Sequence, residues 1–409
     1  MQFIPILSAM RRNKVGPVLI ALQIAITLAI LSNGLFLIQQ RIELSRRPTG
    51  ADEANVLAID NQWVGNPPDI AARQEADLAA LRSLPGVQEA FASNTVPLTN
   101  TGSSTGISLH PDQKTASATA GVYYGDPHAI AGLGLRLVAG RNFNWDEVAD
   151  LSFANNLTPP RAIIITRALA DRLFPDGSAV GKSVYDTSLN ALEPIVGVVD
   201  RLQVPWVTAG GWGSKFSEYS VIEPFHITAP VPVVYIVRVQ PGQMTPLIQA
   251  APKKLFELNG ARLIKWSQPL ATLRNDAYRD DKGLVVVLST VCAALLSVTA
   301  FGIVGLASYW VAQRRRQIGI RRALGSTRRG ILNYFQAENL LIATAGAALG
   351  VLLTLSLNLW LVSAFAMERL NIGYTVVGVV SVVLLGQAAV LWPAMKAASI
   401  SPALATRGS

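Results

Sequence analysis

Four apolar segments, each long enough to cross a lipid bilayer, restrict this chain more than any other feature of its sequence. They cover residues 17–38, 283–311, 331–363 and 374–392. The first has 22 residues without a charge, which form a helix of roughly 33 Å, the thickness of a hydrocarbon core. The sequence therefore predicts a membrane domain of four transmembrane helices, with a short outer loop at 364–373.

Residues 1–16 form a basic arm before the first apolar segment. Its apolar residues predict an amphipathic stretch on the membrane surface, and a disordered leader is the alternative. A cleaved signal peptide has an apolar region of only about 7–15 residues. The longer segment here, which is followed by QQRIELSRRP, favours an uncleaved anchor with its N-terminus in the cytoplasm.

The net charge of +9 is distributed unevenly along the chain. Residues 39–282 hold 22 basic and 24 acidic residues, a net charge of −2. The excess positive charge lies in the N-terminal arm, in residues 312–330 and in the tail at 393–409, each next to an apolar segment. This pattern places those segments and both termini in the cytoplasm and residues 39–282 outside it. It also argues against a nucleic-acid partner, despite the basic composition.

Residues 312–330, the arginine segment, combine dense positive charge with ordered apolar positions. Gly325 is suited to end one helix with a positive φ, and Thr327 or Ser326 can cap the next. Because the preceding apolar segment continues into the arginines without a break, we expect one helix from Leu284 to Leu324. Alternatively, the arginines only keep this segment in the cytoplasm. That role would not require a turn at Gly325 between two helices.

The run RRRQIGIRRALGSTRRGIL resembles the corresponding stretch of the FtsX/MacB-type permeases of ABC transporters. In that family this stretch ends the second membrane helix and docks on the ATPase subunit. The resemblance therefore implies a coupling element made of Arg314, Arg315, Arg316, Ile318, Ile320, Arg321, Leu324, Gly325, Thr327 and Arg328.

The third apolar segment contains two glycines and one glutamate with predicted roles. Gly346 and Gly350 form a G-x-x-x-G pattern, which predicts close packing against another helix. Glu338 lies near the cytoplasmic end of the segment, where we expect it to pair with Arg328, Arg329 or another arginine nearby.

The large domain at 39–282 begins and ends with a strand–helix–strand pattern, at about 52–96 and 231–270. Two such units commonly form one split βαβ sheet with the helices on one face. Residues 97–230, rich in Gly, Pro and short β-like runs, are then an insertion. The fold class is an α/β extracytoplasmic domain on an α-helical membrane domain. The resemblance agrees, because it implies a porter-like βαβ part interrupted by a mainly-β subdomain.

Two segments depart from the family pattern, residues 142–160 and 206–216, and are candidates for contact with cargo or a partner; solvated loops are the alternative. The run GSAVGKS at 177–183 has three residues between its glycines, whereas a phosphate-binding loop needs four. We read it as a turn before a strand, so we expect no ATPase in this sequence.

The resemblance implies a permease subunit of a MacB-like ABC transporter that exports a small molecule, peptide or lipid-linked cargo. It implies a separate ATPase that binds ATP and Mg²⁺, a second permease in a dimer, and a periplasmic adaptor with an outer-membrane channel. The expected location is the bacterial inner membrane. The alternatives are an FtsX-like regulator that transports nothing and a LolC/E-like subunit for lipoprotein release. The scattered His110, His128 and His226 and the single Cys292 support neither a metal site nor an enzyme.

Overall fold

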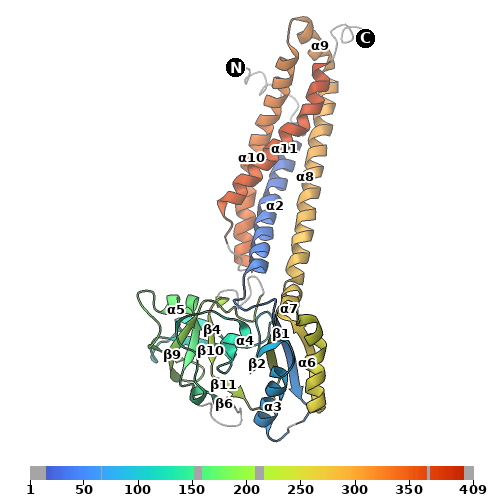
Figure 1. The fold of residues 1–409 in the computed structure, drawn as a ribbon. Helices are drawn as coiled ribbons and strands as arrows, with labels where there is room; N and C mark the ends of the chain where they lie inside the picture. Colours follow the sequence, from blue (N-terminus) through green and yellow to red (C-terminus); the bar gives the residue numbers. More distant parts are fainter. Residues whose placement is uncertain (1–14, 66, 152–158, 208–215, 366–368, 400–409) are drawn as a thin grey trace. The chain divides into compact units, whose positions relative to one another are not determined.

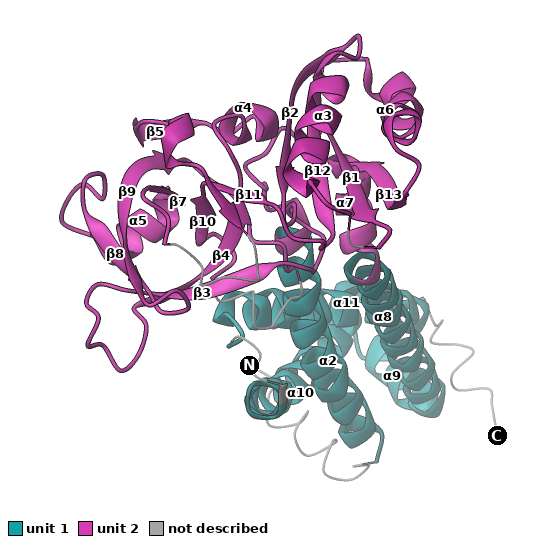
Figure 2. Ribbon diagram, turned by 90° about the horizontal axis from the view of Figure 1, so that it is seen from below, with its two compact units in different colours: residues 1–43, 281–409 teal, residues 44–280 magenta. Residues whose placement is uncertain are grey.

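In the computed structural model, the described residues are 15–65, 67–151, 159–207, 216–365 and 369–399. The chain divides into two compact units, shown in different colours in Figure 2. Residues 1–43 and 281–409 form the helical unit, and residues 44–280 form the strand-rich unit. The predicted domain at 39–282 is slightly longer than the strand-rich unit, because its flanking helices reach past the expected ends of the apolar segments.

The helical unit is built of helices, and the chain passes through the strand-rich unit between the first of these helices and the next (Figure 1). They are α2 (Val15–Arg46), α8 (Arg279–Gln313), α9 (Arg315–Ala323), α10 (Arg328–Phe365) and α11 (Ile372–Ala398). By length and apolar composition, α2, α8, α10 and α11 are candidates to span a membrane. Of these, α2 extends eight residues past the predicted end at residue 38, since Arg41 pairs with Asp281 of α8 at 2.5 Å.

Helix α2 makes buried polar contacts with α8 and α10. The hydroxyls of Thr27 and Thr299 on α8 are 2.8 Å apart, and the Asn33 amide donates to the Thr354 carbonyl on α10 at 3.3 Å. Hydrogen bonds of this kind add to van der Waals packing between membrane helices.

The small residues of α10 lie directly against α2. A Cβ added at Gly346 would come within 2.8 Å of the Ala21 carbonyl oxygen, and one at Gly350 within 3.1 Å of the Ala25 Cα. Only glycine permits this approach, so the G-x-x-x-G pattern marks the α2–α10 contact.

The structure corrects two predictions about these helices. The expected continuous helix from Leu284 to Leu324 is interrupted at Arg314, whose φ of −95° and ψ of 7° leave the helical region. Helix α9 then turns so that Ile318 packs into the helical core. The second correction concerns the fourth apolar segment, which was predicted to end at residue 392, directly before Pro393. Pro393 lies inside α11 because its buried side chain packs among neighbouring helices, which offsets the lost backbone hydrogen bond.

The strand-rich unit is built on a four-stranded antiparallel sheet. Its strands are β1 (Val56–Trp63), β2 (Val87–Ser93), β12 (Val233–Val239) and β13 (Arg262–Pro269), in the order β13-β1-β12-β2. The connections β1 to β2 and β12 to β13 pass through α3 (Ile70–Arg82) and α6 (Met244–Leu258). Each strand–helix–strand unit therefore contributes two strands that are separated by a strand of the other unit.

The two faces of this sheet are covered by different elements. Helices α3 and α6 share one face, where Leu81 and Leu255 pack against Leu57. The opposite face, which carries Val56, is covered by α4 (Ala129–Leu133), by α7 (Leu270–Ala277) and by part of the insertion. Strand β1 begins at Val56, whereas the pattern was predicted to begin at about residue 52, because residues 52–55 form a turn closed by hydrogen bonds between Asn55 and Asp52.

The insertion folds mainly into a closed barrel, visible as a ring of strands in Figure 2. Its strands follow the order β9-β7-β10-β4-β3-β8, and pairing of β8 with β9 closes the ring. The bounds are β3 (Ser103–Ser108), β4 (Ala118–Tyr124), β7 (Ile163–Thr166), β8 (Ser183–Asp186), β9 (Ala191–Val199) and β10 (Ser220–Glu223). Helix α5 (Arg167–Leu173) packs into the barrel core, and the run at 177–183 is the turn before β8, as predicted.

Short elements complete the unit. Strand β5 (Leu137–Gly140) adds to the outside of β9, and β6 (Ala149–Leu151) pairs with β11 (Phe225–Ile227) in a small parallel sheet. The 3₁₀ turn η1 (Trp145–Glu147) precedes β6. Leu151 and Phe225 join the core beneath α3, so this sheet extends that face of the four-stranded sheet.

Candidate functional site

The arginine segment forms a helix, a glycine corner and the start of a second helix. Gly325 has a φ of 96°, and its backbone N–H donates to the Arg322 carbonyl at 3.1 Å. The Thr327 hydroxyl then accepts from the Gly330 N–H at 3.1 Å, which caps the first turn of α10. Both end signals therefore act at the residues where the sequence predicted them.

A hollow of about 510 Å³ lies between α9 and the start of α10. Its apolar wall includes the buried side chains of Ile318, Ile331 and Phe335. Its polar rim carries the Arg321 guanidinium, which lies 5.2 Å from the centre of the Tyr334 ring. The hollow thus combines an apolar wall with positive charge, which suits an acidic and apolar protein partner.

Two apolar side chains of this segment project away from the chain's own core. Leu324 is 83% exposed and Ile320 is 46% exposed. Ile318 was expected to contact a partner with them, but it is only 6% exposed because α9 packs it against the other helices. Ile318 therefore fixes α9 in place, and Leu324 and Ile320 are the apolar residues available for contact.

The arginines divide into an exposed and a partly buried group. Arg315, Arg316, Arg321, Arg328 and Arg329 are exposed. The half-buried Arg322 donates from Nη1 to the carbonyl oxygen of Ala398, at 3.0 Å, which joins α9 to the end of α11. Within the described part of the chain, no ion pair involves Arg315, Arg316, Arg328 or Arg329. Their charge is therefore available to a partner.

The half-buried Arg314 has a partner in the third apolar segment. Its Nη1 lies 3.0 and 3.1 Å from the two carboxylate oxygens of Glu338, which is 2% exposed. Arg328 and Arg329, the two arginines named first in the prediction, lie ten and nine residues before Glu338 on the same helix, α10. The arginine that pairs instead is the one at the α8–α9 break, so this ion pair joins that break to α10.

The strand-rich unit brings together histidines that are scattered along the sequence. The ring of Trp145 lies 5.3 Å from His128 and 6.2 Å from His226, measured between ring centres. His128 Nδ1 is 2.9 Å from Glu89, and His226 Nε2 is 3.7 Å from Asp126. The tertiary fold brings these residues together, although they share no motif. The candidate contact segments lie partly outside the described residues, at 152–158 and 208–215.

Known families match both parts of the chain. Residues 18–255 match the MacB-like periplasmic core domain, and residues 289–402 match the FtsX-like permease C-terminal family. The first match alone covers more than half of the chain.

Individual relatives agree with these matches. The macrolide export ATP-binding/permease protein MacB of Campylobacter jejuni is 25% identical over 350 residues, 80% of this chain and 48% of that protein. An uncharacterized ABC transporter permease of Bacillus subtilis, YvrN, is 26% identical over 275 residues, 60% of this chain and 62% of that protein. The chain spans less than half the length of the MacB proteins that it matches.

A crystal structure of the periplasmic region of MacB from Actinobacillus actinomycetemcomitans is also similar. It aligns with 57% of this chain and 97% of its own, with 16% sequence identity and a TM-score of 0.36. The family assignment comes from the sequence matches, which extend from the first candidate span through the arginine segment to the last helix. The chain therefore belongs to the MacB/FtsX-type family of ABC transporter permeases.

Proposed function

We propose that this chain is the permease subunit of an ABC transporter whose ATPase is a separate protein, and that the arginine segment docks on that ATPase. The observation that carries the proposal is the exposure of Leu324 and Ile320 among arginines that have no acidic partner in the described part of the chain. Exposed apolar anchors surrounded by charge are typical of protein interfaces.

The proposed mechanism is the transmission of movement. When two ATPase subunits close on ATP, they displace α9 and the glycine corner. Ile318 and the Arg314–Glu338 ion pair hold α9 to α10, so the displacement is shared by both helices. Helix α8 carries it to residue 279, where the chain enters the strand-rich unit. In this proposal the break at Arg314 acts as a joint between the docking helix and the long helix.

The proposed topology has four transmembrane helices in the bacterial inner membrane. The arginine segment and both termini are cytoplasmic, because they carry the excess positive charge. The strand-rich unit is then periplasmic, and its four-stranded sheet is the porter-like part with the barrel as its insertion. We further propose that two permeases pair and that the cargo is a small molecule, peptide or lipid-linked compound exported through an adaptor and an outer-membrane channel.

Copurification tests this proposal. The tagged full chain is purified in mild detergent from its own organism and assayed for associated ATPase activity. We expect an ATPase with the wild type, and about a tenfold or greater loss with Leu324→Asp, because a charge at an apolar anchor costs about 2 kcal/mol or more. Leu263→Asp, a change at an exposed leucine of β13, is the matched control and should retain the ATPase. An ATPase retained equally by Leu324→Asp would refute docking at this segment.

A further inference from the structure

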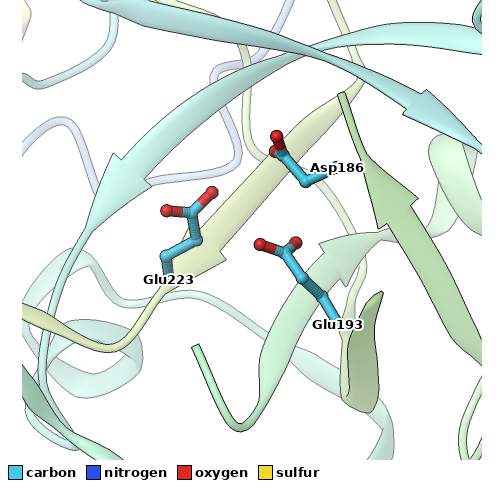
Figure 3. Close-up of side chains that lie close together, drawn as sticks. All are labelled: Asp186, Glu193 and Glu223. Atoms are coloured by element: carbon cyan, nitrogen blue, oxygen red, sulfur yellow. The ribbon is translucent and has the colours of Figure 1, made fainter. Parts of the chain in front are cut away.

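Three carboxylates from separate strands meet inside the barrel of the strand-rich unit. They belong to Asp186 at the end of β8, Glu193 on β9 and Glu223 at the end of β10. Each is an even number of residues from a barrel-core residue on its own strand (Val184, Ile195 and Val221), so all three side chains point inward. Figure 3 shows the three carboxylates turned toward one another.

Each of these side chains is removed from water. Asp186 is 1% exposed, Glu193 is 0% exposed and Glu223 is 3% exposed. One ligand oxygen from each lies within 4.8 Å of the other two. A buried carboxylate normally requires a paired cation or several hydrogen bonds, since its desolvation costs several kcal/mol.

The cluster lacks the usual compensation. Asp186 Oδ1 accepts from the backbone N–H groups of Ser188 and Leu189, at 2.6 and 2.8 Å. Both carboxylate oxygens of Glu193 are buried and have no hydrogen-bond partner. In the described ranges, no lysine or arginine forms an ion pair with any of the three acids. A fully buried side chain thus directs two unpartnered oxygens into a group of like charges.

The distances between the carboxylate oxygens indicate which ion could neutralise their charge. Calcium binds carboxylate oxygens at 2.3–2.6 Å, so two oxygens on opposite sides of one ion are up to about 4.6–5.2 Å apart. Three oxygens within 4.8 Å of one another can therefore share a single ion. An all-oxygen, carboxylate-rich ligand set selects hard divalent cations over zinc or copper.

We propose that Asp186, Glu193 and Glu223 bind one hard divalent cation, calcium or an ion of similar size, inside the barrel. The ion would join β8, β9 and β10 across the point where pairing of the short strand β8 with β9 closes the ring. It would thus stabilise the closed barrel, a role separate from the docking of an ATPase.

The charged form of the cluster is unfavourable when no ion is bound. Burial, followed by the neighbouring Asp186, raises the pKa of Glu193 to about 8, and burial raises that of Glu223 well above its ordinary value. Without a cation these carboxyl groups are therefore either protonated or carry an unfavourable charge. A bound cation would take the place of the protons. The hydroxyls of Thr105 and Ser188 are 2.9 Å apart and add polar atoms near the cluster. Ser188 lies two residues after Asp186, and Thr105 lies two residues before Ile107, the strand partner of Asp186.

Metal binding is measured on the full chain in detergent after dialysis against a chelator. Mn²⁺ is titrated and followed by electron paramagnetic resonance, and Ca²⁺ is then added as a competitor. We expect one Mn²⁺ per chain, displaced by Ca²⁺. We also expect the apparent unfolding temperature to rise by about 5–10 °C when Ca²⁺ is present at about a hundred times its dissociation constant.

Glu193→Gln and Glu223→Gln keep the side-chain shape and remove one charge each. Both should abolish Mn²⁺ binding and the rise with Ca²⁺. Both should also fold, because without metal each relieves repulsion between buried acids. Asp112→Asn, at an exposed acid between β3 and β4, is the matched control and should bind like the wild type.

Two results would overturn the proposal. One is a metal-free wild type that takes up no Mn²⁺ and shows no response to Ca²⁺, which would mean that the acids are held protonated. The other is Mn²⁺ binding that both glutamine variants retain, which would place the ion elsewhere in the chain.

Discussion

The buried ion pair between Asp77 and Arg262 joins three elements of the strand-rich unit. Two guanidinium nitrogens of Arg262 on β13 each lie 2.8 Å from a carboxylate oxygen of Asp77 on α3, and the Tyr235 hydroxyl of β12 donates to the same carboxylate at 2.7 Å. Both charged side chains are almost inaccessible to solvent. The ring of Trp63 lies 4.4 Å from the guanidinium and covers it.

We predict that Asp77→Asn destabilises the protein by about 3–5 kcal/mol, because it leaves the buried charge of Arg262 uncompensated. The apparent unfolding temperature of the purified full chain should fall clearly. Asp176→Asn, at an exposed acid, should change stability by no more than about 0.5 kcal/mol. Equal stability of Asp77→Asn and the wild type would show that the pair is not needed to hold α3 on the sheet.

The Arg314–Glu338 ion pair could be predicted only in part. The sequence showed that Glu338 needs a positive partner at its depth in the membrane. It could not show which arginine, because that depends on the break after α8, and no glycine or proline marks the break. Tertiary contacts of Ile318 and Glu338, rather than local propensity, decide where the helix is interrupted.

We predict that Glu338→Gln destabilises the helical unit by about 1–3 kcal/mol, since it leaves a half-buried guanidinium with a weaker acceptor. The exchange variant Arg314→Glu with Glu338→Arg should recover part of this loss. Thermal unfolding of the full chain in detergent measures both effects. If the exchange variant loses as much stability as the sum of Arg314→Glu and Glu338→Arg measured singly, the two residues do not interact.

At the scale of helices and strands, the sequence predicted part of the contact between α2 and α10. The glycines at 346 and 350 predicted a close helix contact, although they could not identify α2 as the partner. The end of α9 was equally readable, because Gly325 and Thr327 act locally. The end of the fourth apolar segment was predicted too early. Pro393 lies inside α11 because neighbouring helices accommodate it, and a local pattern does not include those helices.

We predict that Gly350→Leu separates α2 from α10 and lowers the apparent unfolding temperature of the full chain. The added side chain would overlap with Leu28 and Ala25 on α2, and overpacking of this kind costs about 1–3 kcal/mol. Gly305→Leu on α8 is the control, since a Cβ at Gly305 meets no atom within 4 Å. If both variants unfold at the same temperature as the wild type, the glycines are not required for this packing.

The barrel was the element least accessible to sequence reasoning. Residues 97–230 were expected to be mainly β, but the closure of the ring depends on pairing between β10 and β4, which are about 100 residues apart. The three acids of the barrel share no motif and lie on three strands, so their meeting follows from register alone. By contrast, the strand–helix–strand units have local patterns, and α3 and α6 lie within the ranges predicted for them, about 52–96 and 231–270.

At the scale of the whole molecule, one ion pair secures the strand-rich unit where the chain enters and leaves it. Arg274 on α7 donates to Glu53 at 2.5 and 2.6 Å and to the backbone oxygens of Ser45 and Arg47, at 2.9 and 2.8 Å. This holds the segment after α2 next to the segment before α8. The two chain ends of the strand-rich unit are therefore tied into one connected base.

The pKa of Glu53 makes this base sensitive to acid. Burial alone would raise that pKa, but the hydrogen bonds from Arg274 and Thr49 outweigh it and hold the pKa below its ordinary value. The pair therefore stabilises the fold above about pH 4.3, the unfolded value, and this contribution is lost as pH falls through the lower folded value. We expect Glu53→Gln to be less stable than the wild type at pH 7 and to approach it below pH 4.

The thermal stability of both proteins between about pH 3 and pH 7 checks this expectation. Glu43→Gln, a change at a glutamate at the end of α2, is the control and should follow the wild type at every pH. Parallel curves for Glu53→Gln and the wild type would contradict the assigned role of the pair.

The most direct test of the central claim is a photocrosslink from the glycine corner. A photoreactive phenylalanine analogue replaces Leu324, the most exposed apolar residue of the arginine segment, and in a second protein it replaces the exposed Leu384 in the middle of α11. After illumination in membranes, the adducts are identified by mass spectrometry. The docking account predicts an adduct with a nucleotide-binding ATPase from position 324 and none from position 384. Adducts with lipid alone from both positions would contradict it.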